Sequence, residues 1–192
     1  MKFSTALHLL RNYNYLGEKK LADGTHLIGK APHIAPLAWL HSIYPPISNE
    51  QVNELENRIG TPIAGDYYLF LKSSNGLNVF NTTFCLYGYR SNYNRNSIDV
   101  WQPFDIIIPN TTERPREAKT AIFFIGSYDW DGSRLYIDTN TNNVHLCGQD
   151  NMASKYRWEN FEQMLESEIN RLITLFDNQG RQLDENKTTL PI

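Results

Sequence analysis

The sequence predicts an α+β fold in which helices pack against an antiparallel-rich meander sheet. Three short strand-like segments, separated by two polar turns, follow one another within residues 122–147. Segments with a helical spacing of apolar residues come before and after this part of the chain. Strands joined by short turns pair antiparallel, and each helix must bury one apolar face. We therefore expect the helices to cover one face of the meander.

The composition is that of a soluble globular protein. The chain has 192 residues and a formal net charge of −3, which suits one domain with at most a small extension. The slight negative charge argues against a nucleic-acid-binding protein, and no apolar run is long enough to cross a membrane. We therefore expect a soluble, cytoplasmic protein with no nucleic-acid or membrane partner.

Two cysteines, Cys85 and Cys147, lie in apolar, strand-like surroundings. They form no CxxC motif, which argues against a zinc site. They could pair as a disulfide, but buried reduced thiols are the favoured interpretation. No cofactor and no metal ion are expected.

The first 33 residues predict a helix and a hairpin, which together form an N-terminal extension. The helix is indicated by apolar residues at i, i+3, i+4 and i+7, namely Phe3, Ala6, Leu7 and Leu10. Asp23-Gly24, between two short apolar segments, is typical of a hairpin turn. The proline-punctuated stretch that follows, residues 34–43, predicts one short helix around Trp39.

Two further helices are predicted before the sheet. Ser48 and Gln51 form a capping box, in which each side chain accepts a hydrogen bond from the other residue's backbone amide. Gly60 is suited to end this helix because glycine tolerates a left-handed backbone. The second helix is expected over residues 66–72, and Asn75-Gly76 should turn the chain into a strand.

The second half of the chain is predicted to be mostly strands. Residues 83–89 and 100–108 are strand candidates, and polar loops follow each of them. The first turn of the meander is Asp129-Trp130-Asp131-Gly132, where Asp accepts local backbone hydrogen bonds and Gly supplies a positive φ. A last helix is expected to begin at Trp158 with one broad apolar face, and residues 178–192 are expected to be a polar, frayed tail.

Several short motifs occur in a distinctive order. The first group is Tyr44-Pro45-Pro46-Ile47-Ser48, Asp66-Tyr67 and Asn75-Gly76. The second group is Phe124-Ile125-Gly126-Ser127, Asp131-Gly132, Leu135-Tyr136-Ile137-Asp138 and Val144, then Trp158, Phe161 and Leu165. In this order the motifs resemble the SUKH superfamily of Smi/Knr-type domains, although Ile63-Ala64-Gly65 stands where the family commonly has Leu-Pro. The resemblance places a SUKH-like domain over residues 34–177, between the extension (1–33) and the tail (178–192).

The resemblance implies a non-catalytic, protein-binding domain. Many bacterial members of the superfamily are immunity proteins that bind and neutralise a cognate toxin. Fungal members act as intracellular scaffolds in signalling and cell-wall synthesis. We expect an immunity protein whose partner is a cognate toxin, and a regulatory scaffold that binds another protein is the alternative. On both hypotheses the chain is not an enzyme.

The partner-binding residues are predicted from the residue types that dominate interface hot spots, which are Tyr, Trp and Arg. Trp130 is the leading candidate, because turns lie on the surface and turn chemistry does not explain an aromatic residue there. The predicted contact residues are Trp130, Asp129, Asp131, Arg134, Tyr89, Arg90 and Tyr93. Tyr87 and Trp101 either join this surface or pack within the sheet.

A third hypothesis is a metal-dependent hydrolase that uses Asp129 and Asp131. Two carboxylates can act as an acid–base pair or hold a divalent cation. However, the Gly is the fourth residue of this turn, whereas an EF-hand loop needs it at the sixth position, and Asp is common in turns for backbone reasons. Cys147 with His145 is a weaker candidate for a nucleophile and its base. Convergence of the two carboxylates in a pocket is therefore the structural test of an enzyme.

Overall fold

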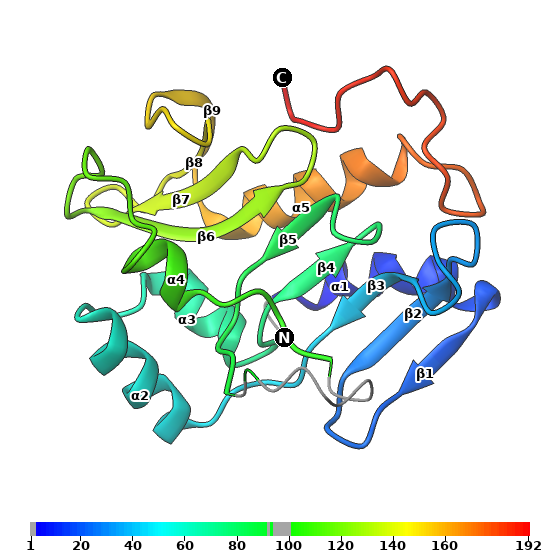
Figure 1. Cartoon of the computed structure of the whole chain (residues 1–192), viewed down its shortest axis with the longest axis horizontal. Helices are drawn as coiled ribbons and strands as arrows, with labels where there is room; N and C mark the ends of the chain where they lie inside the picture. The colour runs from blue at the N-terminus through cyan, green and yellow to red at the C-terminus, as the bar shows by residue number, and fades with distance from the viewer. Residues whose placement is uncertain (1–2, 92, 94–100) are drawn as a thin grey trace.

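The computed structural model describes residues 3–91, 93 and 101–192, and within them the chain forms one nine-stranded sheet (Figure 1). Each strand pairs antiparallel with the next strand along the chain, from β1 to β9. The predicted α+β fold is confirmed, and the meander runs through the whole sheet. In the described part of the chain, no helix has both the length and the apolar character needed to cross a membrane.

The strands are β1 (Glu18–Lys20), β2 (His26–Lys30), β3 (Trp39–Ile43), β4 (Leu77–Val79), β5 (Phe84–Leu86), β6 (Ile122–Tyr128), β7 (Arg134–Asp138), β8 (Val144–Cys147) and β9 (Ser154–Trp158). The helices are α1 (Ser4–Leu9), the 3-10 helix η1 (Leu10–Leu16), α2 (Asn49–Ile59), α3 (Gly65–Leu71), α4 (Ile107–Asn110) and α5 (Phe161–Ile173).

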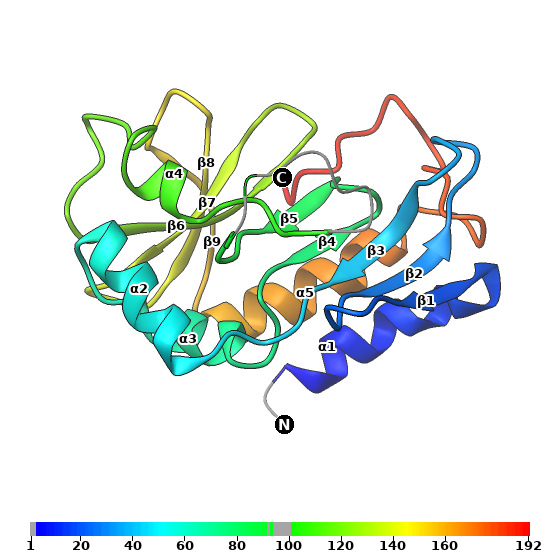
Figure 2. The same cartoon turned by 60° about the horizontal axis from the view of Figure 1, so that its bottom comes forward.

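Helices α1, α3 and α5 lie on one side of the sheet, as Figure 2 shows. They enclose the main hydrophobic core, in which aromatic rings from distant parts of the chain meet. The ring of Phe3 lies 5.8 Å from that of Phe70 and 5.4 Å from that of Phe161, edge to face in both cases. Such pairs stabilise the fold beyond the burial of the rings themselves. The N-terminal segment therefore shares its core with the rest of the chain.

The opposite face of strands β6 to β8 carries a smaller apolar cluster. Because side chains alternate along a strand, Phe123 and Ile125 enter the main core, whereas Phe124 joins Tyr136 on the outer face. Asn110, at the end of α4, holds the backbone of Phe124 from the side. Its Nδ2 donates to the Phe124 carbonyl at 2.8 Å, and its Oδ1 accepts from the Phe124 amide at 2.9 Å. This side chain continues the pairing of β6 beyond the end of β5.

Most local predictions are confirmed. The hydroxyl of Ser48 accepts from the Gln51 amide at 3.2 Å, and the Gln51 side chain accepts from the Ser48 amide at 2.8 Å. Gly60 and Gly76 have φ angles of 80° and 89°, as their turns require. Cys85 and Cys147 are both buried and free, so the expectation of reduced thiols is also confirmed.

Two predicted elements between the N-terminus and the meander are wrong. Residues 34–43 do not form a helix, because Trp39–Ile43 is strand β3, which pairs with both β2 and β4. Its residues are buried on both sides, which hides the period-two pattern of a half-buried strand. The strand predicted over residues 100–108 is also wrong within the described residues. Only Asp105 makes an isolated bridge, to Gly88, and the short helix α4 follows. Val100 and most of the predicted loop 91–97 lie outside the described residues.

Two predictions near the C-terminus are wrong as well. Trp158 does not begin the last helix, because it ends the edge strand β9; Asn160 caps α5, accepting from the Gln163 amide at 2.9 Å. The tail is not frayed: Leu190 is buried, and the Arg171 guanidinium donates to the Thr189 carbonyl at 2.6 Å. Both errors come from contacts between distant residues, which local sequence patterns do not reveal.

Candidate partner-binding site

The turn between β6 and β7 is shaped by the chemistry that the sequence predicts. The Asp131 carboxylate accepts from the Ser133 amide at 2.8 Å, and Gly132 has a φ of 71°. The second carboxylate oxygen of Asp131 lies 3.3 Å from the Lys155 ammonium on β9. Asp131 therefore caps its own turn and connects it to the edge strand.

Asp129, the other carboxylate of the turn, has different neighbours. It lines a cavity together with the β4–β5 turn and the segment after α5, whereas Asp131 does not. Burial raises the pKa of Asp129 above its usual value. Among the described residues, no three His, Cys, Asp or Glu side chains gather closely enough to hold a metal ion. This cavity is therefore not one that the two carboxylates share, as the hydrolase hypothesis would require of an active site.

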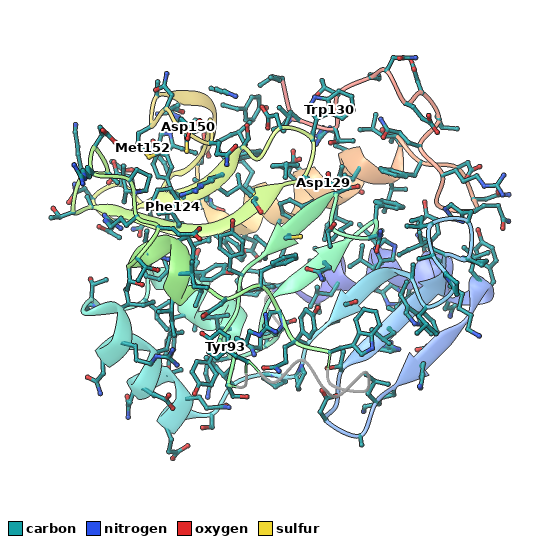
Figure 3. The ribbon with its side chains drawn as sticks, viewed as in Figure 1. Tyr93, Phe124, Asp129, Trp130, Asp150 and Met152 are labelled. Carbon is teal, nitrogen blue, oxygen red and sulfur yellow. The ribbon has the colours of Figure 1, made fainter. Side chains whose placement is uncertain are left out.

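Trp130 lies at the tip of this turn, where 42% of its surface is exposed (Figure 3). The strand end that carries it is held by a buried network. The hydroxyl of Tyr128 donates to the Glu168 carboxylate at 2.5 Å, and the same carboxylate oxygen lies 2.6 Å from the Arg171 guanidinium. Arg171 in turn donates to the Thr189 carbonyl. The strand end that carries the exposed indole is therefore held by buried polar contacts.

Tyr89, Arg90 and Tyr93 lie far from this turn. Strand β5 separates the two groups, and Figure 3 shows Tyr93 and Trp130 in different parts of the molecule. Tyr89 is only 6% exposed, and its backbone is bound by the Asn75 side chain, which donates to its carbonyl at 2.8 Å and accepts from its amide at 2.7 Å. Tyr89 is therefore part of the protein interior rather than of an open surface.

Tyr93 is more exposed than Tyr89 but already has partners within the chain. Its surface is 49% exposed, and its hydroxyl donates to the Asp105 carboxylate. The other oxygen of Asp105 accepts from the Ile107 amide at 3.0 Å. The Arg90 guanidinium lies 5.4 Å from the centre of the Tyr93 ring, at the distance of a cation–π contact. The hydroxyl and the ring of Tyr93, which a partner could otherwise bind, therefore already make contacts within the chain.

The side chain of Arg134, at the start of β7, lies on the outer face of the sheet and apart from both groups. Its guanidinium carbon lies 5.8 Å from the Phe124 ring on the outer face of the sheet, and it donates to the Glu113 carbonyl at 3.2 Å. The structure thus brings Asp129, Trp130 and Asp131 together and distributes the other predicted contact residues elsewhere. Tyr87 packs within the sheet, and Trp101 is half-buried.

The cysteines are poorly suited to nucleophilic catalysis. Burial raises the pKa of Cys147 to about 11 and that of Cys85 well above its usual range, so the reactive thiolate is disfavoured. His145 stacks on Tyr136 with ring centres 5.0 Å apart, and its Nδ1 lies 2.8 Å from the Ser154 hydroxyl. These contacts give His145 a structural role on the outer face.

Sequence reasoning missed the residues that surround Asp129. His33, Asn81 and Arg181 come from three segments that the sequence does not connect, and the sequence predicts a frayed tail at Arg181. The exposed position of Trp130 could be inferred from turn chemistry, but the cavity that Asp129 lines depends on long-range packing. Phe176, at the end of the apolar face expected for the last helix, was the available signal that the chain continues to pack here.

Comparison with known proteins supports the resemblance found in the sequence. The family model described as the SMI1 / KNR4 family (SUKH-1) matches residues 46–167, which is more than half of the chain. The matched part includes α2, α3, strands β4 to β9 and the first half of α5. A comparison with curated proteins gives no match. The chain belongs to the SMI1/KNR4 family, SUKH-1.

Proposed function

We propose that this chain is an immunity protein that binds a cognate toxin in the cytoplasm and neutralises it without catalysis. Membership of the SUKH-1 family supports a protein-binding role. The observation that carries the proposal is the exposed indole of Trp130 on a turn that is fixed by internal hydrogen bonds. A rigid, exposed tryptophan is a typical interface anchor.

A turn that is already ordered is a good binding site because it loses little conformational entropy on association. Binding immobilises side chains and loops, and each flexible side chain that becomes ordered weakens the complex. Asp131 and the Tyr128–Glu168–Arg171 network order the Trp130 turn before a partner arrives. The burial of the indole then contributes to affinity without the loss of loop entropy that a mobile turn would suffer.

Neutralisation would be steric. A stable protein–protein interface covers roughly 800 Å² on each partner, which is enough to close an active site. A net charge of −3 suits a basic partner such as a nuclease toxin, because complementary charges speed association. The Asp129 carboxylate, beside Trp130, adds negative charge where such a partner would dock, whereas the Asp131 carboxylate is already paired with Lys155.

A regulatory scaffold is the second candidate function, and it would use the same surface on a different protein. The observation that favours it is the same family membership. Gene neighbourhood separates the two functions, since an immunity gene lies beside the gene of its toxin.

Co-expression tests the proposal directly. The toxin encoded beside this gene is induced in a bacterial host with and without this protein, and a toxin of the same class from an unrelated locus serves as the control. We expect rescue of growth and a complex on size-exclusion chromatography with the neighbouring toxin alone. Growth arrest in the presence of this protein, with no complex, would refute the immunity function.

A further inference from the structure

A cavity of about 560 Å³ is lined by Asp129, the residue that precedes Trp130. The β4–β5 turn and Asp129 form one side of it, residues 33–34 form a second side, and the segment that follows α5 forms the third. Only the first side lies within residues 46–167, the part matched by the family model. The cavity is therefore built where the family domain meets two flanking segments of this particular chain.

The floor of the cavity is aromatic. The rings of Phe80 and Phe176 stack with their centres 3.9 Å apart and their planes 3° from parallel. The wall behind Phe176 is ordered, because the Asp177 carboxylate accepts from the amides of Gln179 and Arg181, each at 2.8 Å. Phe80 is buried, whereas Phe176 is partly exposed and can present its ring to an apolar or cationic group.

The β4–β5 turn at the rim has an unusual backbone. Phe80, Asn81 and Thr82 have φ angles of 46°, 50° and 82°, three consecutive left-handed positions without glycine. Such conformations are unfavourable for L-residues and persist only where the surrounding structure holds them, which is common at ligand-binding sites. The Asn81 amide donates to the Leu40 carbonyl at 2.7 Å, and this bond helps to fix the turn.

The carboxylates in and near the cavity differ in the groups that shift their pKa values. The backbone amides of Arg181 and Gln179 lower the pKa of Asp177, and the charges of Arg181 and His33 lower it further. Asp177 is thus stabilised in its charged form by groups of its own segment and by two cations that line the cavity. Asp129 differs, since partial burial raises its pKa. A second carboxylate, Glu185, also lines the cavity.

We propose that this cavity receives a lysine or arginine side chain of the protein partner, with the cationic group on the Asp129 carboxylate and the aliphatic part over Phe176. The choice of a protein partner rests on the proposed function. Trp130, the next residue after Asp129, packs against the same partner segment at the rim. Basic side chains combine an apolar stem with a charged end, which matches an aromatic floor beside a carboxylate.

This arrangement also gives the site selectivity. Three residues of the cavity, His33, Arg181 and Glu185, lie outside the part of the chain that the family model matches. The positive charge of Arg181 disfavours a basic partner residue on its side of the cavity, whereas the carboxylates of Asp129 and Glu185 favour one. The flanking segments thus determine which basic loop fits the cavity.

The first experiment compares Asp129→Asn with Asp150→Asn. Asp150 is an exposed carboxylate after β8, and Figure 3 labels it away from Asp129. Binding of the catalytically inactivated toxin encoded beside the gene is measured by calorimetry. We expect Asp129→Asn to weaken binding about 30-fold, as at an interface hot spot, and Asp150→Asn to stay within about twofold. Equal affinities for the two variants would overturn the inference while the immunity function stands. No binding by the unaltered protein would instead refute the immunity function.

A second measurement tests the cavity without the toxin. Nuclear magnetic resonance follows a titration with N-acetyl-arginine amide, and N-acetyl-norleucine amide serves as the neutral control. We expect saturable shifts of the Asn81, Asp129 and Phe176 amide signals with the arginine derivative alone, and their loss in Asp129→Asn. Shifts that are absent from the unaltered protein, or unchanged in the variant, would refute the cavity as a site for basic groups.

Discussion

The two ends of strand β5 carry similar side chains but differ in how those side chains are used. At one end, Tyr89 and Tyr93 are bound by Asn75 and Asp105, so the polar groups serve the fold. At the other end, Trp130 is exposed and Asp129 borders a cavity. Residue type alone predicted both ends as partner contacts. The difference teaches that a contact surface is recognised by groups that the protein leaves available, and not by its content of Tyr, Trp and Arg.

The largest predicted effect concerns the buried network of Tyr128, Glu168 and Arg171, which holds the strand end that carries Trp130. Glu168→Ala removes a buried carboxylate that binds both Tyr128 and Arg171. Breaking a buried pair by removing one partner costs about 3–5 kcal/mol in the free energy of unfolding. Urea unfolding measures the loss, and Glu166→Ala on the exposed side of α5 is the control, expected within about 0.5 kcal/mol. A loss below about 1 kcal/mol for Glu168→Ala would show that the network does not support the turn.

The next prediction concerns the end of β5 that carries Tyr89 and Tyr93. Asn75→Ala removes two buried hydrogen bonds to the Tyr89 backbone. Because the carbonyl and the amide of Tyr89 then stay buried without these partners, we expect a loss of roughly 2–4 kcal/mol in the free energy of unfolding. The exposed Asn53→Ala is the matched control. Reduced toxin affinity at unchanged stability in Asn75→Ala would contradict the structural role assigned to this end.

A pH effect is predicted at the cavity end, behind Phe80. His41 is fully buried, its Nδ1 accepts from the Phe80 amide at 3.4 Å, and burial lowers its pKa to about 3. The unfolded chain takes up a proton on His41 below pH ~6.5, whereas the folded protein does not until about pH 3. Stability therefore falls as the pH decreases below 6.5, by about 2 kcal/mol between pH 6.5 and pH 5.

The control for this effect is His41→Asn, which keeps an acceptor near the Phe80 amide but has no titrating group. Denaturant midpoints are compared for both proteins across this pH range. We expect the difference in unfolding free energy between the two proteins to change by about 2 kcal/mol between pH 6.5 and pH 5. Parallel pH profiles would show that His41 is not held neutral.

Local signals in the sequence predicted much of the fold. The capping box of Ser48 and Gln51, the turn at Asn75-Gly76 and the Asp129–Gly132 turn each depend on neighbouring residues, and all are observed. Strand β3 was missed because it is buried on both sides, and β9 because its exposed edge residues do not alternate.

The site was predictable to a smaller extent. The exposure of Trp130 followed from its place in a turn, which is a local property. The burial of Tyr89 depends on Asn75, 14 residues away in the chain, and the cavity depends on segments near residues 33, 81 and 181. No periodicity or spacing links such distant residues. Their proximity is a result of tertiary packing.

The central claim is that the Trp130 end, and not the Tyr93 end, binds the partner. Calorimetry of Trp130→Ala and Tyr93→Ala with the neighbouring toxin tests it most directly, with thermal unfolding to confirm that both variants fold. We predict that Trp130→Ala weakens binding about 30-fold, or about 2 kcal/mol, and that Tyr93→Ala stays within about twofold. A loss of affinity in Tyr93→Ala with full affinity in Trp130→Ala would contradict the account.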